Sequence, residues 1–145
     1  MSNAKYAEIL EQSSVPKKVW KTALYLRLSR DDGTESESNS IASQREILKE
    51  YIKRYPDMEI YDIYVDDGYS GTNFDRPDFN RMMDDIYAHK VNCVLVKDLS
   101  RFSRNHTEGG IYLDKIFVKL GVRFIAINNQ IDIGIRGINS FNDLV

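Results

Sequence analysis

The feature that most constrains the fold is a regular alternation of short apolar runs with longer stretches of helical periodicity. The apolar runs span residues 20–28, 59–65, 91–96 and 122–127. The stretches that follow repeat apolar residues at three- and four-residue spacing, the pattern of one buried helix face. Strands that alternate with helices pair in parallel, and the helices cover both faces of the sheet. We therefore predict a three-layer α/β/α domain with a mostly parallel central sheet of four to five strands.

Capping residues and apolar periodicity predict three helices. Ser40 suits the N-cap of a helix over residues 41–54, and Pro77 suits the first position of a second helix. A third helix is predicted over residues 105–120. Gln44 falls on the buried stripe of the first helix, so we expect it to have a hydrogen-bond partner.

Composition indicates one soluble globular domain. The 145 residues are 42% hydrophobic and 29% charged, and no apolar run is long enough to span a bilayer. A single cysteine, Cys93, rules out an intramolecular disulfide framework, so we expect a cytoplasmic protein. The net charge of −2 argues against strong DNA binding by this domain alone. We assign residues 1–19 to an N-terminal arm or tag-derived segment and residues 20–145 to the domain.

Polar side chains gather where the predicted strands end. The carboxyl ends of parallel strands lie on one rim of a sheet, where α/β proteins bind ligands. Ser29 ends the first strand, Asp66 ends the second and Asp98 follows the third. Four arginines lie at or near the same positions: Arg27, Arg76, Arg101 and Arg104. This convergence predicts a functional site at the rim.

A serine beside an arginine cluster indicates chemistry on a phosphodiester, because the guanidinium fork matches phosphate oxygens and stays charged. Arg27 and Ser29 point to one face of an extended strand. Arg101 and Arg104 lie on one face if a helix has begun there. Positioned cations stabilise a phosphoryl transition state, and Ser29 could form a phosphoserine ester. Neither of the two histidines is placed at this rim, so the general base is not identified.

Each residue also has an ordinary structural explanation. Arg27 could be exposed on a sheet edge, and Arg76 could pair with Asp75 or Asp78. Gln44 could bond to a loop backbone, and the acidic turns could hold a divalent cation. Taken one at a time these explanations are favoured, but together the rim positions favour a functional site.

Four motifs, in order and at family spacing, resemble the catalytic domain of the serine recombinases, the resolvase/invertase family. They occupy residues 25–29, 40–45, 66–77 and 100–105, and the resemblance extends over residues 20–130. Residues 28–32 and 97–101 are most similar to the large, transposon-type serine recombinases. The resemblance implies a resolvase-like fold and a site-specific DNA recombinase.

The resemblance also implies roles for individual residues. Ser29 would cleave DNA and become joined to the 5′ phosphate, leaving a free 3′ hydroxyl, and Gln44 would be the active-site glutamine. The phosphate-binding arginines would be Arg27, Arg76, Arg101 and Arg104. Supporting roles would fall to Asp98, Ser100 and Asp66. The ester conserves bond energy, so religation needs no ATP, and neither a cofactor nor a metal is implied.

Double-stranded DNA at recombination sites is the implied partner, with a homodimer on each site, a homotetramer in synapsis and no membrane association. We expect the family's long oligomerisation helix and its DNA-binding domains to be absent from this chain, which alone would be a monomer or weak dimer. One departure concerns the residue before Arg101: resolvases usually have aspartate there, whereas this chain has Ser100, with Asp98 two residues earlier.

Two alternatives remain open at this point. A receiver-like signalling domain would use Asp66 or Asp67 as phosphoacceptor together with Lys97, but it leaves the four arginines unexplained. A catalytically silent recombinase-like module would serve only in assembly. Phosphorylation by a small phosphodonor would favour the first, and lack of activity would favour the second.

Overall fold

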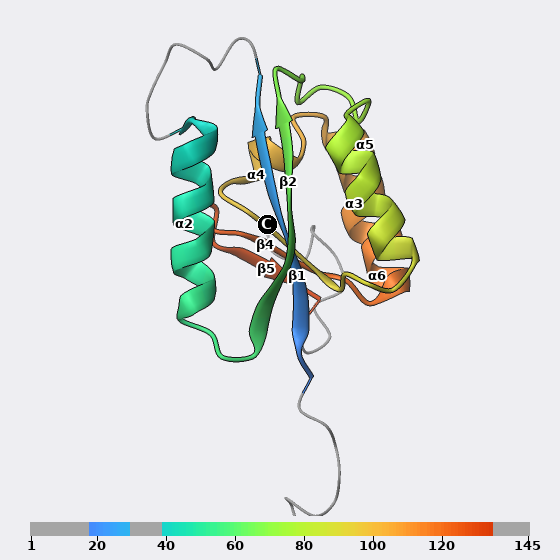
Figure 1. The fold of residues 1–145 in the computed structure, drawn as a ribbon. Coiled ribbons are helices and arrows are strands. Elements are labelled where there is room, and N and C mark those ends of the chain that lie inside the picture. Colours follow the sequence, from blue (N-terminus) through green and yellow to red (C-terminus); the bar gives the residue numbers. More distant parts are fainter. Residues whose placement is uncertain (1–17, 30–38, 135–145) are drawn as a thin grey trace, which may run out of the picture.

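The computed structural model describes residues 18–29 and 39–134, which form a five-stranded sheet between layers of helices (Figure 1). The strand order is β2-β1-β3-β4-β5. Four strands are mutually parallel where they pair, and β5 runs antiparallel to β4. The strands are β1 (Trp20–Leu28), β2 (Met58–Asp67), β3 (Cys93–Val96), β4 (Arg123–Ala126) and β5 (Ile131–Ile133). The predicted fold class is confirmed.

The short strand β5 lies in a stretch that the sequence left unassigned. The chain reverses direction after β4 through a turn in which the Gln130 backbone N–H donates to the carbonyl of Ile127 at 3.1 Å. Gln130 itself has a positive φ of 55°. With only three residues, β5 offers too little alternation for a period-two pattern to be recognised.

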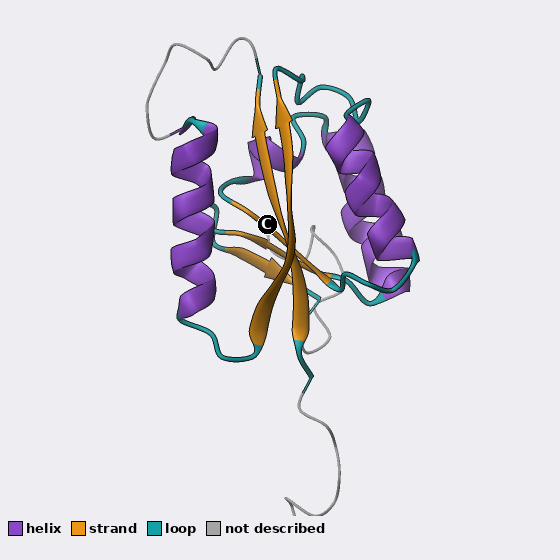
Figure 2. Cartoon of the chain, in the orientation of Figure 1, coloured by secondary structure: helices purple, strands orange, loops and turns teal. Residues whose placement is uncertain are grey.

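Helices cover both faces of the sheet (Figure 2). Helix α2 (Ile41–Lys53) packs on one face, and its N-cap is Ser40, whose side chain accepts from the backbone N–H of Ser43. The other face carries α3 (Pro77–Tyr87), α5 (His106–Ile111) and α6 (Phe117–Leu120). Three predicted features are thereby confirmed: the Ser40 cap, the Pro77 start and helices on both faces.

The predicted helix over residues 105–120 differs from the structure in two ways. A separate short helix, α4 (Leu99–Phe102), precedes it, and a π-helical turn, η3 (Tyr112–Ile116), lies between α5 and α6. The backbone between α4 and α5 is extended at Ser103 and Asn105. The Asn105 side chain then caps α5 by accepting from two backbone N–H groups. Two N-capping residues in close succession, Asp98 and Asn105, therefore make two helices.

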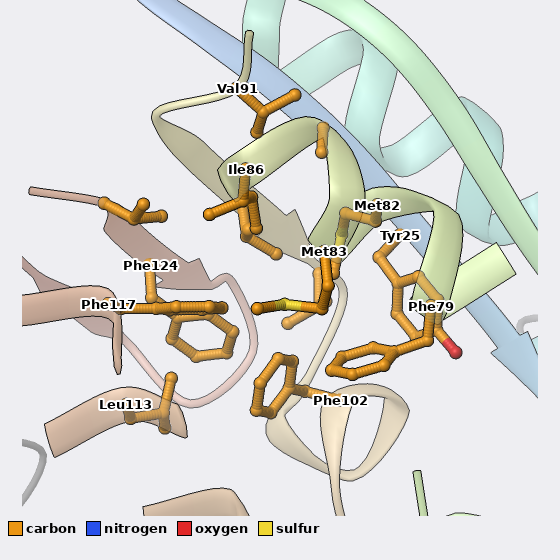
Figure 3. Close-up of a cluster of buried hydrophobic side chains, with 14 of the residues drawn as sticks. Tyr25, Phe79, Met82, Met83, Ile86, Val91, Phe102, Leu113, Phe117 and Phe124 are labelled. Atoms are coloured by element: carbon orange, nitrogen blue, oxygen red, sulfur yellow. The ribbon is translucent and has the colours of Figure 1, made fainter. Parts of the chain in front are cut away.

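The sheet separates two apolar clusters, as the alternation along β1 predicts. Leu24 and Leu26 pack towards α2, whereas Tyr25 packs on the opposite face. On that face Phe102 lies within an aromatic cluster, with its ring centroid 5.7 Å from that of Phe79 and 4.9 Å from that of Phe124 (Figure 3). Because Phe102 is the last residue of α4, this packing fixes the helix that carries Arg101.

Within residues 18–29 and 39–134, no helix combines the length and apolarity needed to cross a bilayer.

The environment of Cys93 gives a test of the packing. Its side chain is fully buried in β3, and burial raises the pKa of the thiol to about 12. Since the thiolate is the reactive form, we expect a thiol reagent at about pH 8 to modify the native chain at least ~100-fold more slowly than the urea-unfolded chain. The unfolded chain, which has one cysteine, serves as its own control. Equal rates in the two states would contradict the buried position of β3.

Candidate active site

The carboxyl ends of β1, β2 and β3 meet at one rim of the sheet. The parallel register places Arg27 beside Asp66. Ser29 directly follows β1 and is 6% exposed, and Asp98 lies just beyond the end of β3. The predicted convergence of polar residues at this rim is therefore confirmed in geometry (Figure 1).

Arg27 is the central cation of the rim. It lies on β1, an interior strand of the sheet, and its side chain is fully buried, so the explanation as an exposed edge residue is wrong. All three guanidinium nitrogens donate to backbone carbonyls: Nε to Arg101 at 3.0 Å, Nη1 to Tyr69 at 2.9 Å and Nη2 to Ser100 at 2.6 Å. The guanidinium therefore ties β1 to the loop after β2 and to α4.

Burial and neighbouring cations act together on this guanidinium. Burial is the largest cause, and the positive charges of Arg76 and Arg101 add to it, lowering the pKa of Arg27 to about 10. The group still carries its charge near neutral pH. The other three predicted arginines, Arg76, Arg101 and Arg104, therefore all lie close enough to Arg27 to repel its charge.

Gln44 bonds to the backbone of β1. Its Oε1 accepts from the backbone N–H of Arg27 at 3.3 Å, and its Nε2 donates to the carbonyl of Arg27 at 3.0 Å and to that of Asn39 at 2.8 Å. The predicted need for a partner is confirmed. The amide thus fixes the backbone two residues before Ser29. The ammonium of Lys97, which the sequence did not single out for this site, donates to the Asn39 side chain at 2.7 Å.

Arg76 is fully buried and held mainly by carbonyls. Its Nε donates to the carbonyls of Ser70 at 3.1 Å and Asn73 at 2.9 Å. Its Nη1 donates to the carbonyl of Phe102 at 2.7 Å and to the Tyr25 hydroxyl at 3.2 Å. These bonds hold the loop after β2 against α4.

Asp78, two residues after Arg76, has other partners. Asp78 accepts from the backbone N–H of Val65 at 2.8 Å and forms an ion pair with Arg81 at 3.4 Å. The explanation of Arg76 as the partner of Asp75 or Asp78 is therefore wrong, because its hydrogen bonds go to carbonyls and to Tyr25.

Asp66 is a buried cap for α3. The N-cap position, Arg76, provides no capping side chain. The Asp66 carboxylate, 1% exposed, instead accepts from the backbone N–H of Asp78 at 3.0 Å and from that of Phe79 at 2.9 Å. It also accepts from the Tyr25 hydroxyl at 2.7 Å. Its hydrogen bonds are those of a residue that joins β2 to α3.

Tyr25 is a residue of this site that sequence reasoning missed. It lies within an apolar run, where a tyrosine is expected to serve packing, and the strand pattern assigned it simply to one face. Burial is the main cause of a raised pKa for its hydroxyl, which therefore stays protonated near neutral pH. A buried tyrosine hydroxyl usually has a hydrogen-bond partner, and that was the one available signal.

Asp98, Ser100 and Arg101 form a local network at the start of α4. Asp98 caps the helix by accepting from the backbone N–H of Arg101 at 3.2 Å and also accepts from the Ser100 hydroxyl. Arg101 lies 3.5 Å from Asp98 through Nε and donates from Nη1 to the carbonyl of Arg27 at 2.9 Å. A carboxylate therefore lies beside Arg101 even though Ser100 precedes it.

Arg104 differs from the other three arginines because its side chain is exposed. The predicted common helix face for Arg101 and Arg104 is wrong: α4 ends at Phe102, Ser103 is extended, and Arg104 lies between α4 and α5. The backbone N–H of Arg104 donates to the carbonyl of Gly71 at 2.7 Å, which joins the two rim loops.

The chemistry that this arrangement can perform follows from its charges. A hydroxyl lies at the end of a central strand, and four guanidinium groups surround or adjoin that rim. Among the described residues, no three histidine, cysteine, aspartate or glutamate side chains gather as a metal-binding group. The arrangement suits an anion such as a phosphodiester, whose oxygens guanidinium groups bind well.

Comparisons with known proteins identify the family. The family described as "Resolvase, N terminal domain" matches residues 22–137. The N-terminal catalytic domain of TP901-1 integrase is 32% identical over 77% of this chain and 81% of that chain, with a TM-score of 0.71. A resolvase family site-specific recombinase from Streptococcus pneumoniae is 38% identical over 78% of this chain and 75% of that chain, with a TM-score of 0.64. No curated protein matches.

The C-terminal catalytic domain of an IS607-like serine recombinase, ISC1926 TnpA, shares the fold at 21% identity and a TM-score of 0.61, covering 74% of this chain and 67% of that chain. The fold and the match together define the class as that of the serine recombinases. The chain belongs to the resolvase family and contains the N-terminal catalytic domain of a serine site-specific recombinase, an enzyme that cleaves and rejoins DNA.

Gly71 provides a test of the rim geometry. A Cβ at this position would lie 2.7 Å from Nη2 of Arg27 and 2.9 Å from Cγ of Arg104. We expect Gly71→Ala to displace Arg27 from its carbonyls, to lower the free energy of unfolding by about 1–3 kcal/mol and to abolish DNA cleavage. Urea unfolding and a cleavage assay measure the two effects.

Gly110→Ala is the matched control. A Cβ at Gly110 meets no atom within 4 Å, so alanine there should leave stability unchanged or raise it by about 0.5–1 kcal/mol through its helix propensity. A Gly71→Ala protein as stable and active as Gly110→Ala would contradict the close approach of Gly71 to Arg27.

Proposed function

We propose that Ser29 is the nucleophile of the recombination reaction. The observation that carries this proposal is the position of Ser29 directly after β1, two residues beyond an arginine whose backbone is fixed by Gln44 and Arg101. The serine thus follows a rigid segment, and rigid support is what a reacting group requires. The family assignment supplies the substrate class, a DNA phosphodiester.

The proposed reaction exchanges one ester for another. The Ser29 hydroxyl oxygen attacks phosphorus and gives up its proton, and the bond from phosphorus to the 3′ oxygen breaks. The 3′ oxygen takes a proton and leaves as a hydroxyl, and the 5′ phosphate remains joined to Ser29. Attack by a 3′ hydroxyl on this phosphoserine reverses the exchange and rejoins the strand, so bond energy is conserved without ATP. No cofactor or metal enters this scheme.

The four arginines divide between two tasks in this proposal. Arg104 is exposed and joined by its backbone to Gly71, and in this proposal its guanidinium contacts a phosphate of incoming DNA. Arg27, with every guanidinium nitrogen bonded to a carbonyl, holds the rim together and adds positive charge to the site. Arg76 and Arg101 stabilise the negative charge that develops on the nonbridging oxygens.

We propose that the active assembly is a homodimer on each recombination site and a homotetramer in synapsis. The chain's net charge of −2 supports this, since a domain without net positive charge needs DNA affinity from neighbouring subunits and domains. Sedimentation of the protein with and without its site DNA would test this arrangement.

The receiver-like alternative is contradicted by the family assignment. Of its two candidate phosphoacceptors, Asp67 is exposed, whereas Asp66 is buried and accepts hydrogen bonds from two backbone N–H groups and one hydroxyl. Phosphorylation there would remove the cap of α3. The alternative of a catalytically silent recombinase-like module is tested only by measuring DNA cleavage.

The nucleophile can be tested by covalent trapping. The protein is incubated with duplex DNA that carries its recombination site and a nick that prevents religation, then run on a denaturing gel. We expect a slow protein–DNA band for the unaltered protein and a loss of at least ~1,000-fold for Ser29→Ala, because the substitution removes the proposed nucleophile. DNA binding by Ser29→Ala, measured by gel shift, should be unchanged.

Ser43→Ala is the control, because Ser43 is a partly exposed serine on α2 whose hydroxyl has no role in the proposed site. It should give the band at the unaltered level. An undiminished band with Ser29→Ala would assign the nucleophile to another residue. If every protein lacked the band while binding the DNA, the proposed phosphoserine chemistry would be wrong.

A further inference from the structure

We propose that Lys97 is a positioning residue that orders the start of α2 and, through Gln44, the end of the strand that leads to Ser29. The inference rests on the proposed function, because it assumes that Ser29 is the nucleophile. It concerns a buried cation to which the proposed reaction gives no task.

Lys97 is buried at the carboxyl end of β3. It follows Val96 directly and is 6% exposed. Lysine is almost never buried unless its charge is paired or hydrogen-bonded, because moving an ammonium out of water is costly. The backbone carbonyl of Lys97 accepts from the N–H of Asn128 at 2.8 Å, which holds the main chain against the turn after β4. The buried ammonium therefore projects from a fixed part of the sheet.

The alternation along β3 directs Lys97 towards α2. Cys93 and Leu95 belong to the apolar cluster that packs against α2, and Lys97 continues their two-residue spacing. The ammonium donates from Nζ to Oδ1 of Asn39 at 2.7 Å. Asn39 directly precedes Ser40, the N-cap of α2, and the helix begins at this end of the sheet (Figure 1). A charge-assisted hydrogen bond thus joins the end of β3 to the start of α2.

Asn39 is also bonded to the amide of Gln44. The carbonyl of Asn39 accepts from Nε2 of Gln44 at 2.8 Å, and the same Nε2 donates to the carbonyl of Arg27 at 3.0 Å. An amide nitrogen has two protons, so these two acceptors use both. On its other side the amide accepts from the backbone N–H of Arg27 through Oε1 at 3.3 Å. The position of Asn39 therefore helps to set how the amide meets the backbone of β1.

The consequence for the reaction lies at the proposed nucleophile. Ser29 comes two residues after Arg27, whose backbone the Gln44 amide holds. A displaced Asn39 would withdraw one acceptor from that amide and loosen its hold on β1. Misplacement of a reacting group by about 1 Å can lower a rate ~100-fold. Lys97 thus acts through two intermediate side chains, and the inference requires no contact between its ammonium and DNA.

Arg123 is a matched control cation. It lies on β4, is 7% exposed, and donates to the carboxylate of Asp132 on β5 at 2.8 and 2.7 Å. Lys97→Met and Arg123→Met each remove one buried charge and leave an unbranched apolar side chain. They differ in the partner that is lost, which is the start of α2 for Lys97 and β5 for Arg123.

The test measures the rate of DNA cleavage at saturating site DNA, together with DNA affinity and the melting temperature. We expect Lys97→Met to lower the rate at least ~10-fold and to change DNA affinity by less than ~2-fold, because the ground-state complex keeps its contacts. Arg123→Met should cleave at the unaltered rate even if its melting temperature falls. Equal rates for the two variants would overturn the inference.

The salt dependence of DNA binding separates positioning from direct contact. An ammonium that bound a DNA phosphate would contribute to counterion release, so its removal would reduce the slope of log K against log salt by about one. We expect the slope for Lys97→Met to equal that of the unaltered protein. A slope reduced by about one would assign Lys97 to the DNA and overturn the inference.

Substitution of Asn39, which is only half-buried, covers the case in which Lys97→Met does not fold. Asn39→Ala removes the acceptor of the ammonium and keeps the carbonyl that meets Gln44. It should also lower the rate at least ~10-fold. In the Asn39→Ala background, Lys97→Met should lower the rate by less than a further ~2-fold, because the bond is already lost. Unaltered cleavage by Asn39→Ala, or a full additional loss in the double variant, would contradict action through Asn39.

Failure of the proposed function is distinguishable from failure of this inference. If Ser29→Ala still forms the covalent complex, the proposed nucleophile is wrong. If Ser29→Ala is inactive and Lys97→Met cleaves like Arg123→Met, only the role of Lys97 is overturned.

Discussion

The site depends on a buried guanidinium that satisfies three backbone carbonyls. Removing a charge from water is costly unless hydrogen bonds replace those to water. Arg27 meets that condition by donating to the carbonyls of Tyr69, Ser100 and Arg101, which belong to the loop after β2 and to α4. The same bonds that make its burial tolerable thus assemble the rim from three separate segments of the chain.

In the proposed reaction, the rim residues divide into those that build the site and those that would contact the substrate. Asp66 and Gln44 direct their polar atoms at backbone groups and at Tyr25, so their hydrogen bonds build the fold. Arg104 is exposed, and Ser29 follows the fixed end of β1. In this account, catalysis needs both sets, because a flexible cation cannot stabilise developing charge without first being ordered.

Sequence reasoning reached the sheet, the capped helices and the common rim because each follows from local periodicity and from parallel topology. It failed where tertiary contacts decide. Ser103 is extended and separates Arg101 from Arg104, and the caps at Asp98 and Asn105 that begin two helices act on only a few residues. Tyr25 looked like a packing residue, since nothing in its neighbours indicates that Asp66 and Arg76 meet at its hydroxyl.

The most direct test of the account compares two arginine substitutions in urea unfolding. Arg27→Met removes the donor to three buried carbonyls and should lower the free energy of unfolding by about 3 kcal/mol. Arg104→Met removes an exposed side chain and should change it by less than about 0.5 kcal/mol. Both should abolish DNA cleavage. Equal stability of the two variants would contradict the claim that Arg27 assembles the rim.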